Sequence, residues 1–240
     1  MSAAPAPSPA SRVSVIVCSR RSPADVRHER DVAATVGVPH EYVRIDNRDG
    51  RYGICAAYNL GVERAAGEVL VFVHEDVWFR SPDWGAVLLD KFEQHPEVGL
   101  VGVMGSQRLI VNNPTWAGAG MPFNRGRLVT VSRRDGTELL AAMADDGADD
   151  YVIVVDGLFM AIRATLFDRV RFDNETFRGF HQYDVDISQQ VARTHRLLVT
   201  RDILVKHDSR GDFDAAWAMD AALFVKKWGA RAIEDCRDQS

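Results

Sequence analysis

The polar residues His74, Glu75 and Asp76 end a stretch that is otherwise typical of a buried strand. The predicted strand covers residues 69–76, and its first five residues are apolar. Because a strand core rejects charge, the three side chains mark the point where the chain reaches solvent or a site. Mg²⁺ is held by carboxylate oxygens, and Mn²⁺ accepts similar oxygens together with an occasional imidazole. The triplet therefore indicates a divalent-cation site, although an ordinary strand end leading into a loop shows the same pattern.

Two later segments carry residues of the same chemical kinds. His207 ends the apolar run 203–207, and its imidazole is a second candidate ligand. Asp184 stands where a helix is predicted to begin, and the helix dipole stabilises an anion at this position. An ordinary N-cap residue would show the same pattern. The sequence contains no P-loop, no HExxH motif and no GxSxG elbow, so the chemistries that depend on those motifs are unsupported.

A parallel sheet is the scaffold that the first half of the chain predicts. Expected strands at 13–19, 40–46, 69–76 and 98–105 alternate with expected helices at 24–36, 53–65 and 82–95. Ligands of such sheets bind outside the carboxyl ends of the strands. Three of those ends are polar here: Ser19-Arg20, Asp46-Asn47 and His74-Glu75-Asp76.

The second half of the chain is less regular. Residues 106–150 contain a Gly-rich stretch, a turn near 124–126 and an acidic loop, and no element is assigned there. Residues 151–163 return to strand character with a turn at Asp156-Gly157, and a helix is expected from about Asp184. Residues 197–209 predict two short strands or one bent strand. A last helix is expected from residue 212, with Phe213, Trp217, Phe224 and Trp228 forming a core-facing stripe.

Length and composition exclude several classes of protein. The chain has 240 residues and a net charge of −5, which suits one domain and disfavours a protein that binds nucleic acid by neutralising phosphates. Its three cysteines match no zinc spacing. No run approaches the roughly 18 apolar residues of a membrane span, and residues 1–12 lack a signal-peptide pattern. We expect a disordered tail over 1–12 and a cytoplasmic protein without a transmembrane segment.

Five motifs in order resemble those of a GT-A fold glycosyltransferase of family 2. The likeness is closest to the StrF-like bacterial branch, whose metal motif reads His-x-Asp instead of Asp-x-Asp. It covers roughly residues 13–210 and rests on VSVIVCSR, on NLG with AAGE before VLVFVHEDVWF, on VDGLFMAIR, on GFHQYDVDIS and on ILVKHDSRGDF. The resemblance implies an α/β fold with a mostly parallel central sheet flanked by helices and a small antiparallel acceptor-side region.

The resemblance also implies a division of one domain over residues 13–240. Residues 13–105 would form the nucleotide-binding half, 106–210 the acceptor and metal half, and 211–235 a C-terminal helix. Asp184 would be the general base, with Asp186 supporting it, and Asp76, His207 and His74 would hold Mn²⁺ or Mg²⁺. The residues expected around the donor are Cys18, Ser19, Arg20, Asp46, Asn47, Asn59 and Glu75 for the nucleotide, and Asp156 and Gly157 for its sugar.

The implied reaction is metal-dependent, inverting transfer of a sugar from a UDP, GDP or dTDP donor to the hydroxyl of an unknown acceptor. Two positions depart from the family pattern: His74 replaces the first aspartate of Asp-x-Asp, and Tyr183 replaces the glutamate before the base.

Two alternatives stay open, a degenerate module that binds a nucleotide-sugar or glycan without turnover, and a nucleotidyltransferase that makes a nucleotide-sugar. A homo-oligomer is also compatible with the sequence. The candidates for binding the acceptor are Trp116, Met121, Phe123, Phe177, Phe180 and His181.

Overall fold

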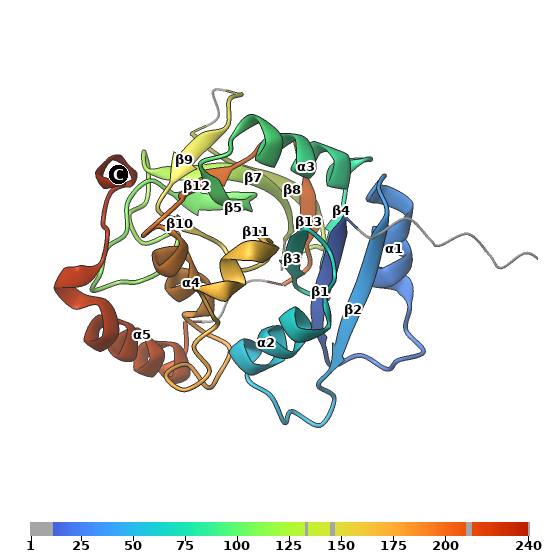
Figure 1. Ribbon diagram of the computed structural model, residues 1–240, viewed down its shortest axis with the longest axis horizontal. Helices are drawn as coiled ribbons and strands as arrows, with labels where there is room; N and C mark the ends of the chain where they lie inside the picture. The colour runs from blue at the N-terminus through green and yellow to red at the C-terminus, as the bar shows by residue number, and fades with distance from the viewer. Residues whose placement is uncertain (1–11, 133, 145–146, 210–212, 240) are drawn as a thin grey trace, which may run out of the picture.

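A computed structural model describes residues 12–132, 134–144, 147–209 and 213–239, which form two β-sheets with helices packed around them (Figure 1). The expected tail lies outside the described residues except for Arg12. None of the helices in the described ranges is long and apolar enough to cross a membrane.

The larger sheet has seven strands in the order β2, β1, β3, β11, β5, β12, β9. Their bounds are β1 (Val13–Ser19), β2 (His40–Asp46), β3 (Val69–Val73), β5 (Val98–Gly102), β9 (Asp150–Val152), β11 (Phe159–Arg163) and β12 (Arg196–Val199). β1 pairs in parallel with β2 and β3, and β5 with β12, whereas β11 is antiparallel to both of its neighbours and β9 to β12. The sheet is therefore mixed, and the expected mostly parallel arrangement is correct only for its first three strands and the β5–β12 pair.

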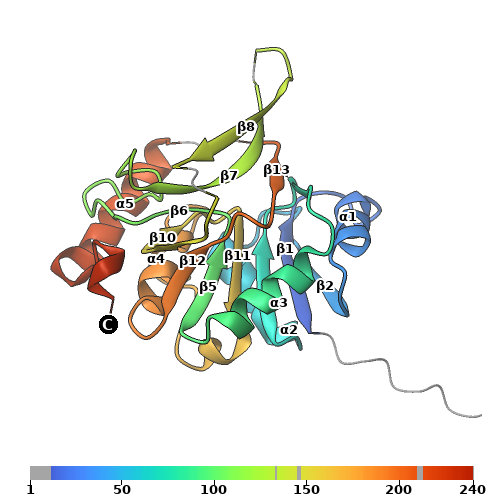
Figure 2. The same ribbon diagram turned by 90° about the horizontal axis from the view of Figure 1, so that it is seen from above.

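The smaller sheet is built mostly from antiparallel pairs and lies beyond one end of the larger one (Figure 2). Its order is β10, β6, β7, β13, β4, and β8 pairs with β7. The bounds are β4 (Val77–Phe79), β6 (Met104–Ser106), β7 (Asn124–Val131), β8 (Glu138–Met143), β10 (Val154–Val155) and β13 (Val205–His207). The β7–β13 pair is parallel. The hairpin of β7 and β8 falls in residues 106–150, for which the sequence predicts no strand, and its β7 begins at the turn expected near 124–126.

Two expected strands are each divided between the sheets. Residues 98–105 form β5 and most of β6, and residues 151–163 contribute to β9, β10 and β11. Where β6 meets β10, a Cβ on Gly105 would lie 2.4 Å from the carbonyl oxygen of Val154. Only glycine allows the backbones to approach this closely, and the crossing carries the chain from one sheet to the other.

Helices cover both faces of the larger sheet because its strands are apolar on both sides. α2 (Ile54–Arg64) and α4 (Tyr183–Val191) pack on the face that includes Ile16 and Phe72. α1 (Arg27–Thr35) and α3 (Trp84–Gln94) pack on the opposite face, which includes Val15 and Val71. Short 3₁₀ segments span Ala164–Asp168, Gly229–Arg231 and Cys236–Asp238. The carboxyl ends of β1 and β3 are thereby fixed beside the smaller sheet.

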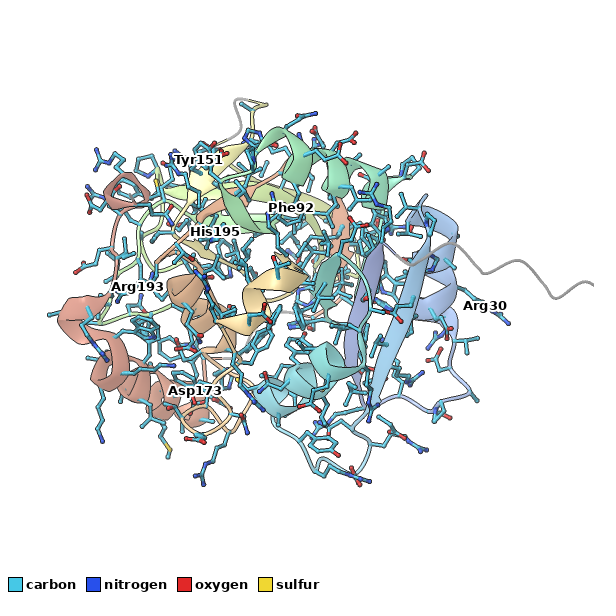
Figure 3. All side chains as sticks on the ribbon, in the orientation of Figure 1. Arg30, Phe92, Tyr151, Asp173, Arg193 and His195 are labelled. Atoms are coloured by element: carbon cyan, nitrogen blue, oxygen red, sulfur yellow. The ribbon has the colours of Figure 1, made fainter. Side chains whose placement is uncertain are left out.

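The C-terminal helix α5 (Ala215–Trp228) is anchored through a buried charge. Trp228 Nε1 donates to Asp186 Oδ1 at 2.8 Å, and Lys227 Nζ lies 2.6 Å from the same oxygen and 2.7 Å from Asp173 Oδ2. Asp173 is labelled in Figure 3. Asp186 therefore supports the attachment of α5. Phe224 is buried with Trp228, but the expected core stripe stops there, because Phe213 is exposed.

Candidate functional site

The group His74, Asp76 and His207 forms a candidate metal centre between the two sheets. One potential ligand atom from each residue lies within 4.8 Å of the other two, and His207 Nε2 is 3.4 Å from Asp76 Oδ1. The chain places them together because β3 ends in the larger sheet at Val73 and β4 begins in the smaller sheet at Val77. In that smaller sheet β4 pairs with β13, and Val77 lies opposite His207.

The protonation states of His74 and Asp76 suit a cation, whereas the hydrogen bond and charge of Asp76 outweigh burial and raise the pKa of His207. Burial, followed by the nearby charge of His207, lowers the pKa of His74 to about 4, so its imidazole is neutral near pH 7. Burial tends to raise the pKa of Asp76, but hydrogen bonds from His207 and Ser209 outweigh it and hold that pKa well below its usual range. Two imidazoles and an ionised carboxylate are a chemically suitable donor set for a divalent transition metal.

His74 is oriented by Tyr183, the residue at the start of α4. The distance from His74 Nε2 to Tyr183 Oη is 2.6 Å. A histidine that binds metal through one ring nitrogen usually gives the proton of the other to a neighbouring acceptor. Gly157 packs directly against this tyrosine, since a Cβ at Gly157 would lie 2.2 Å from Tyr183 Oη. The expected turn at Asp156-Gly157 thus positions Tyr183 as well as the aspartates.

Asp184 and Asp156 form a pair of partly buried carboxylates beside this group. Asp184 accepts backbone hydrogen bonds from Gly157 at 3.2 Å and from Val185 at 2.9 Å. Burial, followed by the charge of Asp156, nevertheless raises the pKa of Asp184 to about 7. Burial also raises the pKa of Asp156. A carboxylate with a pKa near 7 suits a general base that works near neutral pH.

Two cavities meet at this centre. The larger one has a volume of about 550 Å³ and is lined by His74, His207, Asp156 and Asp184 among others. The smaller one, of about 380 Å³, is lined by Cys18, Arg20, Glu75 and Asp76 among others. His74, Phe180 and Tyr183 line both. A further cavity, of about 670 Å³, lies between residues 175–179 and α5 and contains none of the predicted site residues.

Glu75 organises the turn that follows β1. Its carboxylate accepts a hydrogen bond from Ser19 Oγ at 2.6 Å and from the backbone N–H groups of Arg20 and Arg21 at 3.2 and 3.3 Å. Ser19 is itself buried. Both arginines line the smaller cavity, and Glu75 fixes their backbone there. Arg21 was not among the expected site residues, although its position directly after the polar strand end is the signal that could have indicated it.

Three expected nucleotide-binding residues lie apart from this group. The side chain of Asn47 closes its own loop, donating to the carbonyl of Tyr52 at 2.8 Å and accepting from the Tyr52 N–H at 3.0 Å. Asp46 is exposed and pairs with Arg48 at 2.8 Å. Asn59 donates to the carbonyl of Phe172 at 2.8 Å. None of the three lines either cavity, so the structure does not bring them to the site.

The aromatic candidates for the acceptor are also divided by the structure. Trp116, Phe180 and His181 line the larger cavity. Phe177 is fully buried in the core, and Met121 and Phe123 line neither of the two cavities. Tyr58, which no sequence argument singled out, lines the smaller cavity and packs edge-on against Tyr183 at 5.8 Å.

Comparison with solved structures identifies the fold. A mannosyltransferase from Pyrobaculum calidifontis in complex with GDP-Man and Mn²⁺ superposes with a TM-score of 0.59 at 16% identity, over 97% of this chain and 68% of that one. GalNAc-T7 with UDP, GalNAc and Mn²⁺ superposes with a TM-score of 0.55 at 12% identity, over 92% of this chain and 48% of that one. The chain therefore spans about half the length of GalNAc-T7 and shares with both the GT-A glycosyltransferase fold.

Sequence comparison supplies the family. No curated protein sequence matches the chain. Residues 14–228, which include every candidate site residue described above, match the "Glycosyltransferase like family". The protein belongs to this glycosyltransferase-like family.

Proposed function

We propose that the protein transfers a sugar from a nucleoside-diphosphate donor to an acceptor hydroxyl, in a metal-dependent reaction that inverts the anomeric centre. The observation that carries this proposal is the His74–Asp76–His207 group, which lies between two cavities and beside the raised-pKa carboxylate Asp184. The family match and the GT-A fold support it. Placement in family 2, and in its StrF-like branch, belongs to the same proposal.

The donor set of the three residues fits a divalent cation. His74 and His207 offer imidazoles, and Asp76 offers an ionised carboxylate, with ligand atoms close enough together to share one ion. Mn²⁺ accepts this mixture of nitrogen and oxygen ligands more readily than Mg²⁺, which prefers oxygen. When bound, a divalent cation supplies positive charge that stabilises a departing diphosphate.

The smaller cavity suits the nucleotide. Arg20 and Arg21 line it, and their guanidinium groups are suitable partners for phosphate oxygens. Cys18 lines the same cavity, and Ser19 and Glu75 hold the turn that carries the arginines. Asp46, Asn47 and Asn59 are expected to act by supporting the surrounding loops.

Asp184 is the proposed general base. Its carboxylate lines the larger cavity, where it is held by the N–H groups of Gly157 and Val185. There it would take the proton of the acceptor hydroxyl as the acceptor attacks the sugar. Asp156 raises the proton affinity of this base through its own charge, and with Gly157 it would line the donor sugar. Attack from the face opposite the diphosphate inverts the anomeric carbon.

Release of nucleoside diphosphate from a panel of UDP-, GDP- and dTDP-sugars tests the proposal. Release is expected with Mn²⁺ for one base, and it should stop with EDTA and in Asp184→Asn. The variant should still bind the nucleotide, because Asp184 does not line the smaller cavity. Metal-dependent binding with no turnover of any donor would favour the binding module, and turnover of a nucleoside triphosphate with a sugar phosphate would favour the nucleotidyltransferase.

A further inference from the structure

A row of side chains leads from the candidate metal ligand His207 along one face of the smaller sheet. His207 on β13 lies opposite Thr130 on β7, and Thr130 lies opposite Leu139 on β8. Cross-strand partners point to the same side of a sheet. His207, Thr130 and Leu139 therefore form a row on one face, and two strand spacings place the Leu139 backbone roughly 10 Å from that of His207.

The neighbouring residues of the β7–β8 hairpin on this face are mostly apolar. Side chains alternate along a strand, so Leu139, Ala141 and Met143 share one side of β8. Leu128 lies opposite Ala141. Leu128, Thr130, Ala141 and Met143 all line the larger cavity, and Leu139 follows them outward while 49% exposed. Figure 2 shows that the hairpin projects away from the body of the molecule.

Aromatic side chains line the same cavity from other segments. Two of them are Trp217, in the first turn of α5, and Phe213, just before that helix. These two residues belong to the predicted aromatic stripe but are not buried in the core, and their ring centroids are 5.1 Å apart. Phe213 is 65% exposed and Phe180 43% exposed. Asp214 caps α5 through the N–H of Trp217 and lies 3.4 Å from His181 Nε2, which fixes this aromatic pair beside the residues before α4.

The polar groups of the cavity are concentrated at its reactive end. Among the described residues that line it, the charged or titratable ones are His74, Asp156, His181, Tyr183, Asp184 and His207, and none is a lysine, arginine or glutamate. Gln182 is the only side-chain amide among the described lining residues, and Thr115, Thr130 and Ser209 contribute hydroxyls. Sites for highly hydroxylated ligands need several well-placed polar groups, and a phosphate or carboxylate needs cations. The described wall carries no permanent cation, and its side chains Leu128, Ala141, Met143, Phe180 and Phe213 offer no polar group.

We propose that the acceptor is an uncharged alcohol on an elongated apolar body, aromatic or alicyclic, which lies along the inner face of the β7–β8 hairpin. Its hydroxyl is at Asp184, its body is enclosed by Trp116, Phe180 and Trp217, and its far end covers Leu139. This inference rests on the proposed function, since it assigns the acceptor of that same reaction. The transfer joins the acceptor oxygen to the anomeric carbon, breaks the bond from that carbon to the diphosphate and leaves the hydroxyl proton on Asp184.

Binding of small probes to the full chain, saturated with Mn²⁺ and the preferred nucleoside diphosphate, tests this inference by calorimetry. The probes are 4-biphenylmethanol, benzyl alcohol, benzyl phosphate and methyl β-D-glucoside. The expected order has 4-biphenylmethanol tightest, at least about tenfold tighter than the glucoside, since each ring removes apolar surface from water. Trp217→Ala should weaken the biphenyl probe by a similar factor.

Leu139→Ser and Leu140→Ser form a matched pair of variants. The two residues are adjacent on β8, exposed by 49% and 59%, and point to opposite faces of the strand. Leu139→Ser should weaken 4-biphenylmethanol by about fivefold and leave benzyl alcohol unchanged, because only the longer probe reaches this position. Leu140→Ser should change neither.

The possible results separate this inference from the proposed function. Equal or tighter binding of the glucoside or of benzyl phosphate, equal effects of the two leucine variants, or no binding of 4-biphenylmethanol overturns the apolar acceptor while nucleotide binding stands. Failure of every nucleoside diphosphate to bind with Mn²⁺ overturns the proposed function instead, and with it the assignment of this cavity to an acceptor.

Discussion

Tyr183 and His74 are 109 positions apart in the sequence, and their side chains are joined at 2.6 Å. They are the two positions at which the motifs differ from the family 2 pattern that the sequence resembles, which has an aspartate and a glutamate there. Two carboxylates side by side would repel each other, whereas a phenol and an imidazole form a neutral hydrogen bond. In this protein the hydrogen bond fixes the His74 ring and leaves its second nitrogen for the proposed metal ion.

Tyr183→Phe should weaken Mn²⁺ binding by about tenfold, because it removes the partner that orients a metal ligand. Tyr58→Phe is the matched control. The Tyr58 hydroxyl is buried without a hydrogen-bond partner among the described residues, so its loss breaks no hydrogen bond. Titration of Mn²⁺ into the two variants and the wild type, followed by calorimetry, measures the difference. Equal affinities for all three proteins would show that Tyr183 does not orient His74 for metal.

Asp156→Asn should move the acid limb of the pH–rate profile to lower pH. The wild-type rate is expected to rise with pH through about 7, because Asp184 has to be ionised to act as a base. Removing the negative charge of Asp156 favours the ionised form of Asp184 and lowers its pKa, by about one unit. The profile of kcat/KM against pH for both proteins checks this shift. An unchanged or raised midpoint would mean that Asp156 does not set the pKa of the base.

Asp184→Asn should stabilise the metal-free protein at neutral and alkaline pH. The folded-state pKa of about 7 lies above the unfolded value of about 3.9, so the folded protein binds the proton more tightly. Ionisation therefore costs stability as pH rises between those values, and the cost is complete above about pH 7. Asparagine does not ionise, so the variant avoids this loss of stability.

Thermal unfolding of wild type and Asp184→Asn measures this effect. The variant should have the higher Tm at about pH 8, and the difference should disappear near pH 4, where both side chains are neutral. Asp46→Asn is the control, because Asp46 is exposed and bonded to Arg48. A variant that is less stable than the wild type at about pH 8 would show that ionised Asp184 is favoured by the fold.

Local sequence patterns predicted the elements that depend on short-range periodicity. β1 and β2 have the expected bounds, and α2 and α3 are each within two residues of them. His74, Asp76 and His207 could be singled out because charged or imidazole groups directly follow apolar runs. The end of a buried strand is a position that alternation and burial both mark in the sequence.

Contacts between distant segments could not be predicted in this way. The division of 98–105 and 151–163 between two sheets depends on a close approach at Gly105, which leaves no local periodic signal. Asn59 has the type and spacing of a site residue, but its amide bonds to Phe172, a partner 113 positions away. Phe213 and Trp217 have the helical spacing of a core stripe, but Phe213 precedes α5 and Trp217 lies in its first turn, whereas the buried Phe224 and Trp228 lie in its second half.

Calorimetric titration of UDP, GDP and dTDP into wild type and Asp76→Ala, each with Mn²⁺ and with EDTA, tests the central claim most directly. Asp76 bonds with His207 at the point where the two cavities meet, so it should couple metal to nucleotide. We predict that one nucleotide binds the wild type with Mn²⁺, and that both EDTA and Asp76→Ala abolish this binding. Binding that is equally strong without metal or without Asp76, or no binding of any of the three, would contradict a metal-dependent donor site.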